Sequence, residues 1–145
     1  MRSAIAADIP LIIELERESP TAAHWSLGHY KALFSEAQRL RRAWVIESET
    51  TPAGFLIARR VVNEWEIENI LVAPAARRRG LASQLMGTFL ATARGERAEA
   101  VFLEVRDSNQ PARALYEKLG FHKTGRRLGY YDNPREDALT YRLAL

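Results

Sequence analysis

The centre of the sequence has the pattern of a strand, a basic turn, a helix and a second strand in direct succession. Trp65–Val72 is a strand-like run that Pro74 ends, and Gly80–Arg94 carries apolar residues at helical spacing. Ala100–Arg106 then alternates its side chains between two faces, as a strand does. Two strands joined by a helix within one sheet run parallel, with a right-handed crossover. The centre of the chain is therefore predicted to be a parallel strand–helix–strand unit.

The residues before this unit predict a short strand and two helices. The strand covers about residues 2–5, and Asp8 can cap a first helix whose apolar residues approximate helical spacing. Ser26 can cap a second, short helix. Trp25, directly before that cap, can pack on Tyr30 as a hydrophobic staple. Helices therefore precede the main strands of the sheet.

Two more strand pairs and one more helix complete the predicted order. The strands are Ala43–Glu47, Gly54–Val62, Phe121–Arg127 and Ala138–Leu143. Residues 51–54, Thr-Pro-Ala-Gly, have a turn composition that makes the first pair an antiparallel hairpin, and residues 131–134 form the turn of the last pair. The helix begins at about Gln110 and has Gly120 directly after it. This order predicts an α/β or α+β fold, with a mixed sheet between helices.

Length and residue usage limit the class of protein. The chain has 145 residues, 47% of them hydrophobic and 27% charged, which is ordinary for a globular protein and predicts a single domain over residues 1–145. It has no cysteine, which excludes disulfides, thiolate metal sites and a catalytic thiol. Neither a signal peptide nor an apolar run of about 20 residues is present, so we expect a cytoplasmic protein with no membrane partner.

The charged and metal-ligating residues narrow the partners. The formal net charge is +3, and all but three of the 21 basic residues are arginine, whose planar fork grips phosphate. An anionic partner is expected, and the charge alone fits both nucleic acid and a phosphorylated cofactor. His24, His29 and His122 lack carboxylates at metal-ligand spacing, so no metal site is predicted.

The turn at Arg77–Arg79 and the helix start at Gly80 have the composition of an anion site. The first N–H groups of a helix lack intrahelical partners and, together with the helix dipole, attract phosphate. Gly80 and the small Ala82 let a ligand approach the backbone closely. The alternative interpretation is a solvated basic loop before a core helix. The spacing matches neither a Walker A loop nor Gly-x-Gly-x-x-Gly, which disfavours ATP and NAD.

Four segments together resemble the GCN5-related N-acetyltransferase (GNAT) superfamily. Its pyrophosphate loop runs Gln/Arg-x-x-Gly-x-Gly/Ala, and Arg77–Ala82 reads Arg-Arg-Arg-Gly-Leu-Ala. The other three segments are Ile67–Val72, Leu103–Asn109 and Ala114–Phe121. The pattern is similar to the branch that acetylates the N-terminal alanine of a ribosomal protein, and it implies the GNAT fold, a mostly antiparallel mixed sheet with helices on both faces. Ala82 in place of the second glycine is an accepted variant, whereas residues 22–38 are only loosely similar and leave the acceptor open.

The resemblance implies acetyl-CoA as co-substrate. In the superfamily, backbone N–H groups at the end of the fourth strand hold the thioester carbonyl, and the basic turn holds the pyrophosphate. The implied contacts are Ile70, Leu71 and Val72 for the carbonyl, Arg77, Arg78, Arg79, Gly80, Leu81, Ala82 and Ser83 for the pyrophosphate, and Asn109 for the pantetheine arm. The strand edge is expected to have free donors because the two parallel strands splay there.

Three chemical roles need three groups. Amide formation from a thioester needs a neutral amine, a site for the developing oxyanion and a proton for the leaving thiolate. The resemblance implies Glu104 as the base, although the residues alone allow it to pair with Arg106 or to face solvent. Tyr116, with an ordinary pKa of about 10, is the candidate acid, and it also fits a core-facing helix stripe. Glu68 is a rival base that ranks below Glu104.

The acceptor end is supported by fewer residues. An α-amino group has a pKa of about 7.7 to 8.0 against about 10.4 for lysine, so a modest base suffices for a protein N-terminus. The predicted acceptor contacts are Trp25, Glu68, Tyr130, Tyr131 and Asp137, of which the aromatic residues and Asp137 can equally be packing and turn residues.

Three functions stay open. They are an acetyltransferase for a protein N-terminus, an acetyltransferase for a small amine or a lysine side chain, and a non-catalytic acyl-CoA or nucleic-acid binding module. The first leads, and with it we expect a monomer or a weak homodimer that has no nucleic-acid partner.

Overall fold

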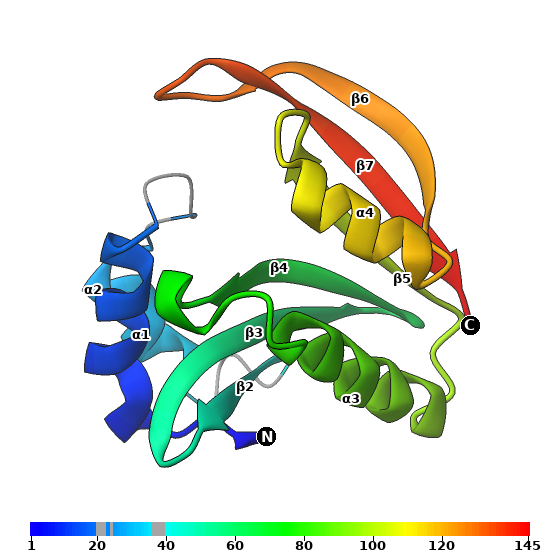
Figure 1. Cartoon of the computed structure of the whole chain (residues 1–145). Helices are drawn as coiled ribbons and strands as arrows, with labels where there is room; N and C mark the ends of the chain where they lie inside the picture. Colours follow the sequence, from blue (N-terminus) through cyan, green and yellow to red (C-terminus); the bar gives the residue numbers. More distant parts are fainter. Residues whose placement is uncertain (20–22, 24, 36–39) are drawn as a thin grey trace.

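A seven-stranded sheet forms the centre of the molecule. In the computed structural model, which describes residues 1–19, 23, 25–35 and 40–145, the strand order is β1-β2-β3-β4-β5-β7-β6 (Figure 1). The strands are β1 (Arg2–Ser3), β2 (Arg41–Ser48), β3 (Thr51–Val61), β4 (Glu64–Val72), β5 (Ala100–Arg106), β6 (His122–Tyr131) and β7 (Glu136–Ala144). The helices are α1 (Ile9–Arg17), α2 (Leu27–Leu33), α3 (Leu81–Gly95) and α4 (Gln110–Lys118), with short 3₁₀ turns η1 (Ala6–Asp8) and η3 (Pro74–Ala76). Among the described strands, β4 and β5 pair in parallel and all other neighbours pair antiparallel, which confirms the predicted mixed sheet.

Helices cover both faces of the sheet and define two hydrophobic clusters. One cluster joins α3 and Tyr116 of α4 to Trp44 and Leu56. The other joins α1 and α2 to Val45 and Phe55 on the opposite face. Neighbouring strand residues enter different clusters because side chains alternate along a strand. Within the described part of the chain, no helix is both long and apolar enough to cross a bilayer.

The parallel strands β4 and β5 separate halfway along their length. Their pairing runs from Glu64 opposite Ala100 to Ile67 opposite Leu103 and then stops. Beyond that point β4 stays paired with β3 as far as Val72, while β5 stays paired with β7. The expected splay is therefore present, and it leaves one side of the second half of β4 without a neighbouring strand.

A bulge at Glu68 changes the face of β4. Ala58 of β3 pairs with Ile67 and the adjacent Ile57 pairs with Asn69, so Glu68 is an extra residue on β4. A bulge of this kind shifts the alternation of side chains by one residue. Ile67 before it packs in the cluster under α3, whereas Leu71 after it packs in the cluster under α1 and α2.

The first hairpin turns two residues earlier than predicted. The turn is Glu49–Thr50, with Glu49 at φ 62°, and residues 51–54 belong to β3. Pro52 lies at an irregularity in the β2–β3 pairing, where a strand tolerates proline. Gly54 is required by a close approach, because a Cβ atom there would lie 2.7 Å from the carbonyl oxygen of Leu71. Pro52 and Gly54, which suggested a turn, are therefore part of strand β3, next to its irregularity.

The predicted start of α2 is correct. The Ser26 hydroxyl accepts a hydrogen bond from the N–H of His29 at 3.1 Å. The ring of Trp25 lies 5.5 Å from the ring of Tyr30, which is buried. The cap and the hydrophobic staple are both confirmed, and Trp25 packs against the apolar cluster under α1 and α2.

The predicted cap of α1 is correct in place but not in its bonding. Asp8 directly precedes α1, yet its side chain caps no N–H of that helix. Its carboxylate accepts from the N–H of Ile5 and from the guanidinium of Arg2, each at 2.8 Å. The η1 turn before α1 explains the difference. Asp8 is the third residue of that turn, and its carboxylate bonds to the N–H of Ile5, directly before the turn, and not to α1.

Candidate active site

A cavity of about 680 Å³ lies where β4 and β5 separate. Eight of the predicted site residues line it: Trp25, Glu68, Ile70, Glu104, Asn109, Tyr116, Tyr130 and Tyr131. They come from α2, β4, β5, α4 and β6 and from the segments that flank these elements. Residues distant in the sequence thus meet at the position where the sheet leaves backbone groups unpaired.

The open edge of β4 supplies backbone donors. The N–H of Ala73 donates to the carbonyl of Ala53, at 2.8 Å, and therefore points toward β3. Because N–H directions alternate along a strand, the N–H of Leu71 also points toward β3, whereas those of Ile70 and Val72 point into the splay. Each of these two N–H groups can donate to a carbonyl oxygen of a ligand that enters the splay.

Glu104 is the first residue of β5 beyond the last β4–β5 pair. Its side chain is 21% exposed and forms an ion pair with Nε of Arg127, at 2.9 Å. The alternative partner, Arg106, instead binds the carboxylate of Glu136 and the carbonyl oxygens of Asp132 and Pro134. Glu104 is thus a half-buried carboxylate in the cavity, neutralised by a cation on the neighbouring hairpin.

Tyr116 of α4 packs in the core and lines the cavity at once. Its side chain is buried, with the ring 5.9 Å from that of Phe121 and 6.2 Å from that of Tyr141. Burial raises the pKa of the Tyr116 phenol above its ordinary value, because a buried phenolate would lose hydration. The two interpretations of Tyr116 from sequence are therefore compatible, and the hydroxyl keeps its proton at neutral and mildly alkaline pH.

Glu68 is tied more firmly than Glu104. Arg41 binds both of its carboxylate oxygens, at 2.7 and 2.9 Å, and Arg59 lies 3.6 Å away. Arg59 also pairs with Glu66. Both carboxylate oxygens of Glu68 are therefore held by Arg41, whereas Glu104 has an ion pair at one oxygen.

The start of α3 has the geometry of an anion site. Gly80 has φ 76°, has no atom within 4 Å of the place where a Cβ would lie, and accepts the first helical hydrogen bond from Gln84. No side chain caps the helix there, so its first N–H groups, those of residues 81–83, have no intrahelical partner. Arg78 is exposed and has no partner among the described residues. The residues present therefore fit a diphosphate group.

The comparisons with known proteins agree with this geometry. The model of the Acetyltransferase (GNAT) family matches residues 9–121. The chain belongs to the GNAT family. It is therefore an acetyltransferase, and the predicted superfamily and enzyme class are confirmed.

Three similar proteins illustrate the relationship. The [ribosomal protein bS18]-alanine N-acetyltransferase of Haemophilus influenzae is 31% identical over 137 residues, which cover 92% of this chain and 90% of the relative. The crystal structure of the ribosomal-protein-S18-alanine N-acetyltransferase from Escherichia coli superposes with a TM-score of 0.86 at 29% identity, covering 98% of this chain and 90% of that one. The structure of Ard1 from Thermoplasma volcanium gives 0.86 at 26% identity, over 99% and 95%.

Aromatic side chains form two walls of the cavity in this GNAT protein. Trp25 stacks on His29 with ring centroids 4.3 Å apart. On the hairpin, Tyr130 and Tyr131 lie edge to face at 5.1 Å, and the guanidinium of Arg106 lies over the Tyr131 ring. Burial, followed by the charge of Glu104, raises the pKa of Tyr131 to about 12. Trp25, Tyr130 and Tyr131 thus line the same cavity as the Glu104 carboxylate.

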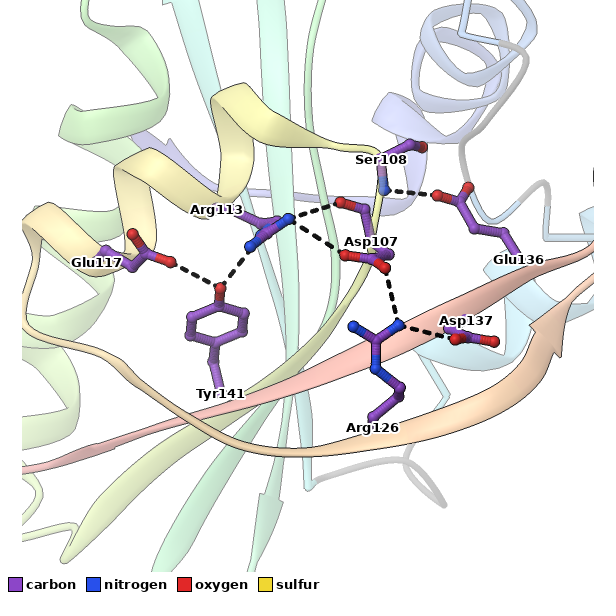
Figure 2. A network of polar contacts seen from close by, with 8 residues as sticks. All are labelled: Asp107, Ser108, Arg113, Glu117, Arg126, Glu136, Asp137 and Tyr141. Carbon is purple, nitrogen blue, oxygen red and sulfur yellow. Dashed lines mark hydrogen bonds and ion pairs between the residues drawn. The ribbon is translucent and has the colours of Figure 1, made fainter.

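Asp137, predicted at the acceptor site, belongs to a network outside the cavity (Figure 2). Its carboxylate accepts from the N–H of Gly129 and from Arg126, each at 2.8 Å. Arg126 also binds Asp107, which binds Arg113 at the start of α4. The network therefore ties the β6–β7 hairpin to the end of β5 and to α4, and it supports the wall that carries Tyr130 and Tyr131.

We expect acid to loosen this hairpin before the rest of the sheet. The N–H of Gly129 and the Arg126 guanidinium lower the pKa of Asp137 below its ordinary value, and the Ser108 and Arg106 donors do the same for Glu136. A carboxyl whose pKa is lower in the folded state contributes stability above its unfolded pKa and loses it as pH falls through the folded pKa. The amide of Gly129 should therefore exchange with solvent faster, relative to core amides, as pH falls below about 4.

A pair of variants tests this prediction. Asp137→Asn should remove part of the pH dependence at Gly129, whereas Asp132→Asn, on the same hairpin, should leave it unchanged. Asp132 is a suitable control because its side chain forms no ion pair with any described residue. Equal behaviour of the two variants would contradict the assignment.

Several cavity residues have no clear signal in the sequence. Arg41, Asn69 and Arg106 line the cavity, and Arg127 reaches Glu104, because of strand register and bulges that a single sequence does not specify. His29 lies one helical turn after Trp25, which is the one local signal available. Among the described residues no group of three or more His, Asp or Glu side chains could hold a metal ion, and His24 lies outside the described residues.

Proposed function

We propose that this GNAT enzyme transfers the acetyl group of acetyl-CoA to the N-terminal α-amino group of a protein, by direct attack in a ternary complex. The observation that carries this proposal is the cavity at the splay, which unites Glu104, Tyr116 and the donor edge of β4. The names of the relatives, which acetylate the alanine of ribosomal protein bS18, support a protein N-terminus as acceptor.

The donor end would be held mostly by main-chain groups. Acetyl-CoA supplies an activated acetyl group as a thioester. The N–H groups of residues 81–83 and the arginines of the preceding turn would bind its pyrophosphate. Asn109, which caps α4 through a contact with the N–H of Ala112, would lie beside the pantetheine arm. The N–H of Ile70 or that of Val72 would donate to the thioester carbonyl oxygen as negative charge develops on it.

Two side chains would move the protons. Glu104 accepts the proton of the acceptor amine, and the α-amino group of a peptide is a suitable partner because its pKa is about 7.7 to 8.0. Tyr116 donates its proton to the leaving sulfur. Since the phenol is kept neutral by burial, the proton is present when the sulfur needs it.

The aromatic walls suit an extended polypeptide. Trp25 on one side and Tyr130 and Tyr131 on the other leave an open cavity between α2 and the β6–β7 hairpin. A second acceptor class, a small amine, is favoured by the cavity volume of about 680 Å³, which lies in the usual range of small-molecule sites. A lysine side chain is disfavoured because its pKa of about 10.4 requires a stronger base.

An acceptor panel tests the proposal. Purified protein and acetyl-CoA are assayed against N-terminal hexapeptides, including one with the ribosomal alanine terminus, beside polyamines and peptides with an internal lysine and a blocked N-terminus. We expect turnover of free N-terminal peptides with the alanine terminus among the best. Turnover of a polyamine with none of any peptide would replace the first acceptor class by the second.

A further inference from the structure

A buried polar pair connects α1 to β4 next to the cavity. The side-chain amide of Asn69 donates to Oε1 of Glu16 at 2.8 Å, and the two residues are 8% and 2% exposed. No lysine or arginine forms an ion pair with Glu16 among the described residues. Burying a carboxylate without a cation is costly, so the pair is a poor choice for stability alone.

The pair lies beside the apolar cluster on the α1 and α2 face of the sheet. Ile12, Leu71 and Phe55 belong to the same cluster, which fills the space between α1, α2 and the sheet. Tyr30 of α2 is buried beside Glu16, and burial together with that carboxylate raises the pKa of its phenol. The side chain of Asn69 therefore finds its hydrogen-bond partner, Glu16, on the α1 side of the sheet.

The position of Asn69 directly after the bulge gives the pair a second consequence. In a β4 without the bulge, Ile57 would pair with Glu68 and every later residue would shift by one. Asn69 would then face the apolar cluster under α3, where Leu85 and Phe89 are fully buried and offer no hydrogen bond. The buried amide thus selects the bulged register, as buried polar residues do in coiled coils.

The same shift would exchange the backbone donors. In the observed register the N–H groups of Ile70 and Val72 face the splay and that of Leu71 faces β3. One residue of slip would turn the N–H of Leu71 into the splay and the other two toward β3. A side-chain contact on one face of the sheet therefore decides which main-chain groups reach the cavity.

We propose that Glu16 and Asn69 are positioning residues, whose hydrogen bond holds the bulge at Glu68 in register. The N–H groups of Ile70 and Val72 thereby face the splay, where one of them can bind the carbonyl of the acetyl group. The inference rests on the proposed function for the identity of the group bound there. Its register argument is independent of activity and can be tested in the ligand-free protein.

The ligand-free readout is amide hydrogen exchange along the end of β4. In the wild-type chain the amide of Leu71 should exchange at least about tenfold more slowly than those of Ile70 and Val72, because it alone is bonded to β3. Asn69→Leu and Glu16→Leu should each reduce this contrast to less than about threefold. An unchanged contrast in both variants would overturn the inference.

The kinetic readout separates positioning from stability. Each of the two leucine variants should lower kcat about tenfold to a hundredfold on the best acceptor of the panel, with a smaller change in the KM for acetyl-CoA. The double variant Glu16→Leu/Asn69→Leu leaves neither member of the pair buried without the other, so its unfolding temperature should recover toward the wild type. Its kcat should stay low, because nothing then selects the bulge. Recovery of kcat together with stability would assign the pair a purely structural role.

Two further variants sharpen the result. Glu16→Gln keeps an oxygen that accepts from Asn69 and should retain kcat within about threefold. If it falls as far as Glu16→Leu, the hydrogen bond is not the cause. Ile12→Val, in the same cluster, should lower the unfolding temperature without lowering kcat. A wild-type chain inactive on every acceptor would refute the proposed function, and the exchange pattern would still test the register.

Discussion

Glu104→Gln should lower kcat by about a hundredfold to ten-thousandfold, the usual contribution of a positioned general base. The amide keeps the shape of the carboxylate but accepts no proton at the pH of the assay. Glu104 is expected to carry this role because it is the first residue beyond the last β4–β5 pair and lines the cavity. The variant should fold and bind acetyl-CoA as the wild type does, which calorimetry and thermal unfolding can measure.

The pH profile distinguishes a lost base from a lost contact. Activity of Glu104→Gln should recover in part as pH rises above about 8, because the acceptor α-amine then loses its proton to solvent. The rival assignment is tested with Glu68→Gln, whose carboxylate is held by Arg41. Native turnover in Glu104→Gln combined with a large loss in Glu68→Gln would move the base to β4.

Tyr116→Phe should lower kcat by about a hundredfold, because the leaving sulfur then departs without a positioned proton. The ring contacts with Phe121 and Tyr141 involve no hydroxyl and are kept, so the unfolding temperature should change little. Tyr141→Phe is a matched control. Its hydroxyl binds Glu117 and Arg113 in the network of Figure 2, outside the cavity, and its removal should leave kcat near the wild-type value.

The wild-type pH profile gives a second test of Tyr116. Burial raises the pKa of Tyr116 above its ordinary value of about 10. The phenol therefore remains protonated at pH values at which the acceptor amine has already lost its proton. The value of kcat should therefore rise with pH and stay level up to about pH 10. A loss of activity well below that pH, in a protein that stays folded, would argue against a neutral phenol as the donor.

The elements of this fold could be predicted from sequence because each has a local signal. The alternation in β5, the cap at Ser26 and the glycine after α4 all act within a few residues. The turn of the first hairpin was predicted two residues late. Pro52 and Gly54 belong to β3, where Pro52 pairs with Glu47 at an irregularity and Gly54 lies close to the Leu71 carbonyl oxygen. Such contacts across a sheet have no signal in the local sequence.

The candidate site divides in the same way. Glu104 and Asn109 were predicted through family resemblance and Tyr116 from the acidity of its phenol, and all three line the cavity. The partner of Glu104 was not predicted, because it depends on two irregularities in the β6–β7 pairing that bring Arg127 over β5. Asp137 was predicted to contact the acceptor, yet its carboxylate accepts hydrogen bonds from the N–H of Gly129 and from Arg126. Ion-pair partners follow from register, which single-sequence patterns leave open.

The splay of β4 and β5 has a consequence for how such an enzyme can change over evolutionary time. The donor groups that it exposes, the N–H groups of Ile70 and Val72, belong to the main chain and are present whatever side chain stands at those positions. The proposed acceptor walls consist of side chains such as Trp25 and Tyr130, which one substitution can replace. Selection can therefore alter the choice of amine while the chemistry of acetyl transfer stays encoded in the path of the backbone.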